Sequence, residues 1–174
     1  MRRIVNSALG LVLVILSIVA TGPMLAATAQ DATPVPVPAG AVDVTIEPLG
    51  SGLPAAADGY RLSLLRVTFA PGGSIGSHTH PGSLVLTVTD GALTYAIIEG
   101  EAEIVRAGDG STPGPTELLT AGQETVLTPG DALFEQGIVH TARNAGDEPS
   151  VVLVSGLMDP DHPFTMFMEA TPTP

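Results

Sequence analysis

Short runs of β-branched and other apolar residues, each ended by glycine, proline or aspartate, recur along the chain from Val42 to Leu157. None of them keeps the 3.6-residue spacing of apolar positions that an amphipathic helix needs over three turns. Closely spaced short strands with turn residues between them are typical of an all-β sandwich or barrel. We therefore expect an all-β fold with strands at residues 42–46, 60–69, 84–89, 92–98, 102–106, 117–119, 124–127, 132–135, 139–144 and 151–157.

The N-terminus has the parts of a secretory signal peptide. A basic start, Met-Arg-Arg, precedes an apolar run over residues 8–20, and an Ala-Thr-Ala cleavage site ends at Ala29. We therefore predict a signal peptide at residues 1–29 and a secreted, periplasmic or extracellular location for the rest of the chain. Two alternatives stay open. Residues 4–20 are almost long enough for a retained membrane anchor, and the Arg2-Arg3 pair hints at twin-arginine export.

Proline-rich sequence flanks the predicted strands. Residues 30–41 contain alternating prolines at positions 34, 36 and 38, which predict an extended linker without a core. Residues 42–158 then form the barrel domain, and residues 159–174, which end in Thr-Pro-Thr-Pro, form a C-terminal tail. A chain of 174 residues is long enough for one domain with a substantial core.

The chain is strongly acidic. It has 18 aspartates and glutamates against 6 basic residues, all of them arginines, for a formal net charge of −12. Removal of residues 1–29 would take Arg2 and Arg3 away and leave every acidic residue in place. Such a surface repels phosphate backbones and anionic lipid, so we expect no nucleic-acid partner and no membrane contact after signal cleavage. The chain has no cysteine, so any metal site must use nitrogen and oxygen donors.

Three of the four histidines lie in two short segments: His78 and His80 within residues 72–82, and His140 within residues 137–144. A His-x-His step on an extended strand places both imidazoles on one face, roughly 6–7 Å apart at Cα. Both rings can then reach one ion at metal–nitrogen distances of about 2.0–2.1 Å. A third histidine from a distant strand would complete the set.

Both histidine segments resemble the two motifs of the cupins, a family of small jelly-roll β-barrels. The positions that match the first motif are Gly72, His78, His80 and Gly91. Those that match the second are Gly130, Gly137, His140 and Asn144. The resemblance spans residues 42–158 and implies a jelly-roll barrel of two antiparallel sheets. Cupins often dimerise through an edge strand, so the resemblance admits a homodimer, and the oligomeric state stays open.

The chain departs from the cupin pattern at two positions. Leu84 occupies the place of the family's metal-binding glutamate, and strand alternation puts Leu84, Leu86 and Val88 on the inner face. The resemblance then implies three neutral imidazoles beside an apolar wall. Glu135 stands where the second motif usually has proline. We expect it to be a solvated carboxylate on an edge strand; a substitute oxygen ligand or a proton acceptor is the alternative.

The resemblance implies that His78, His80 and His140 bind one divalent transition metal: Fe, Zn, Cu, Ni or Mn. Three-histidine sites occur in cupin-like thiol dioxygenases and diketone-cleaving dioxygenases. A metal-dependent, dioxygenase-like oxidoreductase acting on a small organic ligand in the barrel is therefore our first hypothesis. A degenerate, non-catalytic cupin that binds a small molecule or is purely structural is the alternative. We expect Asn144 to make turn or supporting hydrogen bonds and His162 to be a surface residue.

Other catalytic signatures are missing from the sequence. It contains no Gly-x-Ser-x-Gly nucleophile elbow and no dinucleotide fingerprint. The glycine-rich run at residues 72–76 lacks the lysine and the following helix of a phosphate-binding loop, so it predicts a turn. The sequence therefore names no catalytic residue and predicts no nucleotide cofactor.

Overall fold

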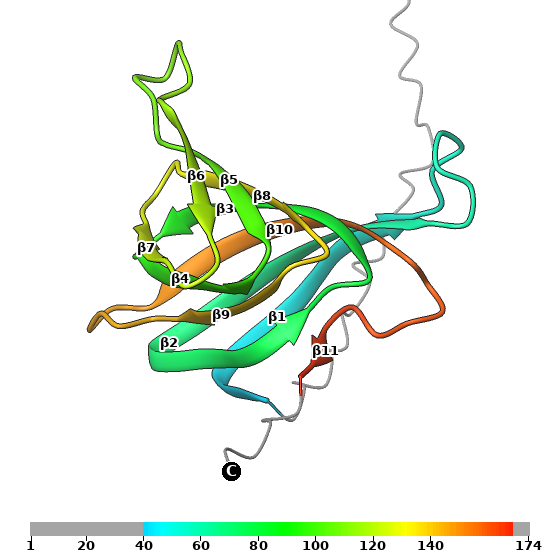
Figure 1. The fold of residues 1–174 in the computed structure, drawn as a ribbon, viewed down its shortest axis with the longest axis horizontal. Coiled ribbons are helices and arrows are strands. Elements are labelled where there is room, and N and C mark those ends of the chain that lie inside the picture. Colours follow the sequence, from blue (N-terminus) through cyan, green and yellow to red (C-terminus); the bar gives the residue numbers. More distant parts are fainter. Residues whose placement is uncertain (1–39, 169–174) are drawn as a thin grey trace, which may run out of the picture. The chain divides into compact units, whose positions relative to one another are not determined.

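The computed structural model describes residues 40–168, which form a nearly closed antiparallel β-barrel (Figure 1). Its strands are β1 (Ala41–Gly52), β2 (Arg61–Thr79), β3 (Gly82–Asp90), β4 (Leu93–Glu99), β5 (Glu101–Val105), β6 (Thr116–Thr120), β7 (Glu124–Leu127), β8 (Ala132–Gln136), β9 (Val139–Arg143), β10 (Ser150–Met158) and β11 (Met166–Phe167). Every predicted strand overlaps one of these. The all-β, jelly-roll fold class is confirmed.

The two layers of the barrel share the long strand β2. One layer has the order β6-β5-β8-β3-β10-β2, and the other continues as β2-β9-β4-β7. Residues 61–69 of β2 pair with β10, whereas residues 74–78 pair with β9. Hydrogen bonding therefore runs without a break from one layer into the other (Figure 1).

The passage of β2 between the layers depends on its glycines. Gly72 has a φ of 78°, a left-handed conformation that favours glycine. A side chain at Gly73 would lie 2.6 Å from the carbonyl oxygen of Asp43 on β1. The turn that we predicted at residues 72–76 is wrong, because these residues stay hydrogen-bonded within β2. They form an irregular stretch that carries the strand across to face β9.

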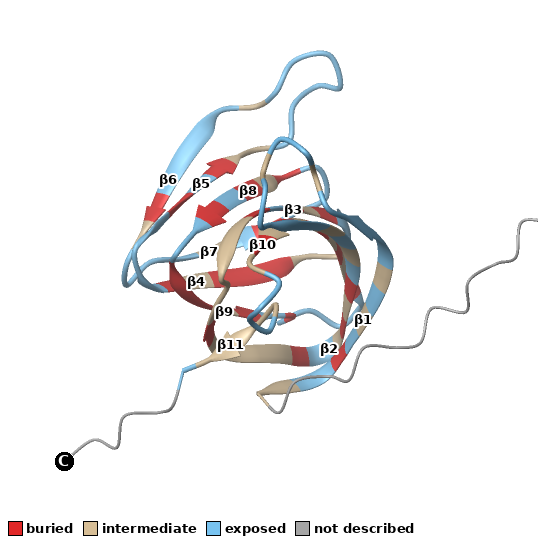
Figure 2. Cartoon of the chain, turned by 90° about the vertical axis from the view of Figure 1, so that its right-hand side faces the viewer, coloured by how far each residue is buried: buried red, intermediate tan, exposed pale blue. Residues whose placement is uncertain are grey.

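Strand alternation fills the barrel. Along β3, Leu84, Leu86 and Val88 are buried while Val85 is exposed, so the predicted inner face is confirmed. Figure 2 shows the same alternation of buried and exposed residues on the strands around the barrel. Each aliphatic side chain buried in this way contributes about 1.5–3 kcal/mol. The core therefore forms without tryptophan and with few aromatic residues.

Residues 159–168 fold back onto the barrel. We had assigned residues 159–174 to a C-terminal tail, but Met166 and Phe167 form β11 and pair with Thr79 and His78 at the end of β2. The amide of Met168 also donates to the carbonyl oxygen of Ser77. A two-residue strand is too short for a recognisable alternation, so the sequence pattern does not predict it. Residues 169–174 lie outside the described part of the chain.

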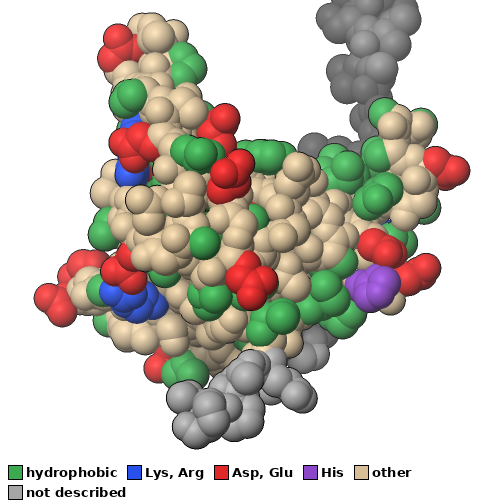
Figure 3. Space-filling model, viewed as in Figure 1, with side chains coloured by type: hydrophobic (Ala, Val, Ile, Leu, Met, Phe, Trp, Pro, Cys, Tyr) green, Lys and Arg blue, Asp and Glu red, His purple; other side chains and the backbone are tan. Residues whose placement is uncertain are grey.

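Acidic side chains are distributed over the face of the molecule that Figure 3 shows. Three arginines are each paired with carboxylates: Arg66 with Glu47, Arg106 with Glu117 and Asp131, and Arg143 with Glu124. The remaining acidic residues keep the surface negative.

Within residues 40–168, no helix is long and apolar enough to span a membrane. The predicted signal peptide (1–29) and nearly all of the linker (30–41) lie outside the described residues.

Candidate metal centre

The barrel brings the three predicted histidines together. His78 on β2 and His140 on β9 are register partners, and His80 lies just beyond the end of β2. The ring centroid of His78 is 4.0 Å from that of His140 and 5.0 Å from that of His80. One potential ligand nitrogen from each ring lies within 4.8 Å of the other two. The three side chains can therefore bind a single metal ion.

Backbone carbonyls fix the tautomers of His78 and His80. The Nδ1 of His78 donates to the carbonyl oxygen of Gly76 at 2.7 Å, and the Nδ1 of His80 donates to that of Phe164 at 2.6 Å. Because Nδ1 carries the proton in each neutral ring, Nε2 keeps its lone pair. This is the arrangement in which proteins orient metal-binding imidazoles.

His140 has a buried nitrogen without a hydrogen-bond partner. Its Nδ1 lies 3.4 Å from Oε2 of Glu135 and makes no hydrogen bond among the described residues. A buried polar atom left in this state costs about 1–3 kcal/mol. The unpaired nitrogen, beside two imidazoles with free lone pairs, fits a site built for a metal ion.

Burial keeps the cluster uncharged. It lowers the pKa of His80 to about 4, with a further contribution from neighbouring His78. Burial also lowers the pKa of His78, and it lowers that of His140 well below the usual 6.5. Neutral imidazoles are the form that binds metals, so the ligands are ready at neutral pH without losing protons.

Glu135 joins the histidines inside the barrel, and our interpretation of it as a solvated edge carboxylate is wrong. Its strand, β8, is internal because it lies between β5 and β3, and Glu135 follows buried Leu133 in the strand alternation. The side chain is 2% exposed. Glu135 Oε1 is 3.7 Å from Nε2 of His80. The alternation with Leu133 was the sequence signal for this inward position.

Tyr95 on β4 supports this carboxylate. Its hydroxyl donates to Oε2 of Glu135, and its ring stacks on His140 at a centroid distance of 4.6 Å. Burial raises the pKa of Glu135 to about 7, and burial beside Glu135 raises the pKa of Tyr95 well above 10. No sequence pattern predicts Tyr95 at this site.

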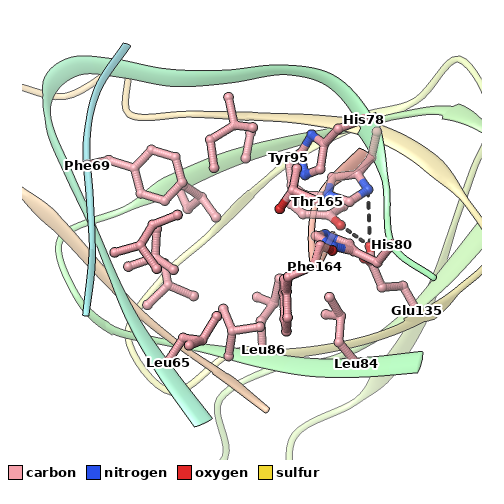
Figure 4. Close-up of a pocket in the computed structure, with 18 residues that line it drawn as sticks. Leu65, Phe69, His78, His80, Leu84, Leu86, Tyr95, Glu135, Phe164 and Thr165 are labelled. Atoms are coloured by element: carbon pink, nitrogen blue, oxygen red, sulfur yellow. Dashed lines mark hydrogen bonds and ion pairs between the residues drawn. The ribbon is translucent and has the colours of Figure 1, made fainter. Parts of the chain in front are cut away.

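The histidines close one end of a cavity of about 60 Å³. Figure 4 shows His78, His80, Tyr95 and Glu135 gathered at that end, with Leu65 and Phe69 at the other. Leu84 and Leu86 form part of the wall, as the sequence predicts. The space holds a few water molecules or a small organic ligand.

Aromatic residues of the C-terminal segment cover the histidines. The ring of Phe164 packs edge-on against His80 at 5.3 Å, and that of Phe167 lies 5.9 Å from His78. Phe164 also lines the cavity. The segment that we had assigned to a tail therefore forms one wall of the site.

His162 and Asn144 lie outside this cluster. His162 is exposed and its Nδ1 is 2.9 Å from Oδ2 of Asp159, in agreement with a surface role. Asn144 is buried and donates from Nδ2 to the carbonyl oxygens of Phe69 and Glu148. These are the supporting hydrogen bonds that we expect of it.

Comparison with known proteins now adds to this geometry. Residues 65–111, which include His78 and His80, match the family model described as "Cupin domain". The chain is similar to the cupins over this stretch. It is 35% identical over 101 residues to germin-like protein 1 of Brassica napus, a match that covers 58% of this chain and 41% of the plant protein.

A second plant relative is auxin-binding protein ABP19b of Prunus persica. It is 31% identical over 99 residues, which are 56% of this chain and 39% of the relative. The matches thus span about two fifths of the length of either relative. Among solved structures, a cupin 2 domain-containing protein from Halorhodospira halophila aligns with a TM-score of 0.47 and 17% identity. That alignment covers 75% of this chain and 72% of the other.

Proposed function

We propose that the protein binds one divalent transition metal ion through His78, His80 and His140. The unpaired, buried Nδ1 of His140 carries the proposal, because this polar atom calls for a partner and lies in a group of three imidazoles able to hold an ion. The free Nε2 lone pairs of His78 and His80 support it. Imidazole donors suit Fe, Zn, Cu and Ni, and an oxygen donor alongside also admits Mn.

We further propose that a small organic ligand enters the cavity and reaches the metal site. The walls at Leu84 and Leu86 offer apolar contacts, while Tyr95 and Glu135 place a hydroxyl and a carboxyl group beside the histidines. Phe164 limits the access of water to this end of the cavity. A volume of about 60 Å³ fits a small ligand better than an extended one.

Oxidation by dioxygen is the reaction class we propose. A bound divalent ion supplies Lewis acidity and, if redox-active, electron transfer. The chain's own residues bind and orient the ligand, and the Tyr95 hydroxyl donates a hydrogen bond to Oε2 of Glu135. The resemblance to three-histidine dioxygenases supports this class of reaction.

Metal titration of purified, chelator-treated protein tests the site. We expect about one equivalent of Co²⁺ or Fe²⁺ per chain, and His140→Ala should abolish binding. His162→Ala is the matched control, because His162 is an exposed histidine away from the cluster. A wild-type protein that binds no metal, or an H140A variant that binds like wild type, would overturn the proposal.

Dioxygen uptake tests the reaction. Fe²⁺-loaded protein is supplied with a short thiol or a 1,3-diketone, and uptake is measured against the H140A variant. We expect uptake with one of these probes. The largely apolar cavity wall favours a second candidate, a non-catalytic binding module. Metal binding without dioxygen uptake, together with probe binding in the cavity, would favour that candidate.

We propose that the protein is exported. The support is the signal-peptide pattern at residues 1–29, which ends in an Ala-x-Ala site. Mass spectrometry of protein recovered outside the cytoplasm should find Gln30 as the N-terminal residue. Recovery of the intact N-terminus in the membrane fraction would favour the retained anchor instead.

A further inference from the structure

We propose that Glu135 provides the metal site with the carboxylate ligand that Leu84 cannot supply, and that Tyr95 positions it. This inference rests on the proposed metal binding and deepens it. It assigns a fourth ligand to the three histidines, from a different strand than the one on which the cupin pattern places a glutamate.

Strand pairing places Glu135 directly opposite Leu84, the position where the cupin pattern has its glutamate. Leu84 on β3 and Glu135 on β8 are Cα partners in the antiparallel register. Directly opposed side chains lie on the same face of a sheet, with Cβ atoms about 4.5–5.5 Å apart. Both residues are buried and line the same cavity. A carboxylate at position 135 can therefore reach the region that one at position 84 would reach.

The distances to the histidines allow a shared ion. Two atoms that each lie about 2.0–2.2 Å from one ion are at most about 4.4 Å apart. Glu135 Oε1 is 3.7 Å from Nε2 of His80, and its Oε2 is 3.4 Å from Nδ1 of His140. Both separations fall inside that limit.

Burial leaves this carboxyl group two stable states. It is protonated and neutral, or it is a carboxylate that is paired with a positive partner or bound to a metal. Among the described residues, the ionisable groups that contact Glu135 are His80, His140 and Tyr95, and the arginines with recorded ion pairs are bound to other carboxylates. A divalent ion between the histidines and Glu135 would provide the missing charge.

Tyr95 holds this arrangement from β4. Its hydroxyl donates to Oε2 of Glu135, and its ring stacks on His140 with an interplanar angle of 19°. One side chain thereby orients the carboxylate and one of the histidines. Tyr95 is a positioning residue in this account, because it acts through Glu135 and His140.

Co²⁺ titration with visible absorption tests the assignment, since the intensity and position of the cobalt bands report the ligand set. Glu135→Gln keeps an acceptor for the Tyr95 hydroxyl and removes the charge, and we expect at least about tenfold weaker binding and altered bands. Glu135→Leu should weaken binding by about 100-fold or more. Loss of a residue that only hydrogen-bonds to a metal ligand usually costs about 10–100-fold, so a larger loss indicates a direct ligand. Glu103→Gln, on exposed residue Glu103 of neighbouring β5, is the matched control.

The double variant L84E/E135L moves the carboxylate back across the strand pair. We expect the double variant to bind Co²⁺ at least about tenfold more tightly than E135L does. Thermal melts establish that each variant is folded, and E135Q, which conserves shape, remains informative if E135L melts too early. Wild-type affinity in both E135Q and E135L would overturn the assignment, as would unchanged cobalt bands at saturation. If wild-type protein binds no Co²⁺, the proposed function itself fails instead.

Discussion

Leu84 and Glu135 face each other across the β3–β8 pair, and both point into the barrel beside the three histidines. An apolar residue thus occupies the place where the cupin pattern has a carboxylate, and a carboxyl group occupies the opposing position one strand away. The charge of this part of the cavity wall is therefore set by positions 84 and 135 together, and it cannot be inferred from either residue alone.

This relationship changes the chemistry expected of the site. Three imidazoles beside an apolar wall would bind an ion with neutral ligands only. With Glu135 at 3.7 Å from His80, the site also contains an ionisable oxygen donor. A negative ligand strengthens the hold on a divalent ion and lowers the net charge of the occupied site.

Metal uptake should release protons in a pH-dependent way. Burial raises the pKa of Glu135 to about 7 in the metal-free protein, while the pKa of His80 is lowered to about 4. At pH 6 the carboxyl is therefore mostly protonated and the imidazole is neutral. Binding of Co²⁺ should release about one proton at pH 6 and close to none at pH 8.

Calorimetry in two buffers of different ionisation enthalpy measures this release. E135Q should release almost no proton at either pH. Release of two or more protons by wild-type protein at pH 6 would mean that the histidines are protonated, contrary to the direction of their pKa values.

Acid should destabilise the metal-free protein through His80. Its pKa is lowered to about 4 in the fold and is near 6.5 when unfolded. As pH falls below 6.5, the unfolded chain takes up a proton that the folded state does not, so stability is lost. At pH 5 this loss is about 2 kcal/mol. The pKa of Glu135 is raised, which works in the opposite direction: its contribution is present at low pH and is lost as pH rises through about 7.

A comparison of two proteins isolates the effect of His80 from that of the many acidic residues. Wild type and His80→Gln are melted with a chelator at pH 7.5 and pH 5. The drop in stability should be smaller in H80Q by about 2 kcal/mol. Equal drops in the two proteins would show that His80 titrates normally in the fold.

Most strands of the barrel can be predicted from local sequence patterns. Alternation predicts the buried face of β3, and turn residues locate the strands, because each signal extends over several consecutive positions. The His-x-His step and the second motif likewise bring His78, His80 and His140 together. Each of these features is encoded within one short stretch of consecutive residues, so it can be predicted without knowing which strands pair.

The remaining parts of the site depend on contacts between distant strands. Glu135 looks like an edge carboxylate until β8 is seen to lie between β5 and β3. The segment at residues 159–168 has no periodic pattern, and its position follows from Phe164 and Phe167 packing on the histidines. Residues 72–76 contain turn-forming glycines, but pairing with β9 keeps them within a strand.

Removal of the C-terminal segment should weaken metal binding. The carbonyl oxygen of Phe164 accepts the hydrogen bond that orients His80, and β11 pairs with His78. A chain that ends at Met158 lacks both supports, so its affinity for Co²⁺ should fall by about 10–100-fold. A chain that ends at Met168 is the control and should bind like the full chain. Equal affinity in both truncated proteins would show that the histidines are held without this segment.

The Tyr95–Glu135 pair should reduce the stability of the metal-free barrel relative to an apolar core. E135L alone leaves the Tyr95 hydroxyl buried without its acceptor, which costs about 1–3 kcal/mol. The double variant E135L/Y95F removes both polar groups and keeps similar volumes, a replacement that is often neutral or stabilising by about 1–4 kcal/mol. Urea unfolding with a chelator should therefore rank E135L lowest and E135L/Y95F at or above wild type. If the double variant is less stable than E135L, the polar pair stabilises the fold, and its presence needs no explanation from metal binding.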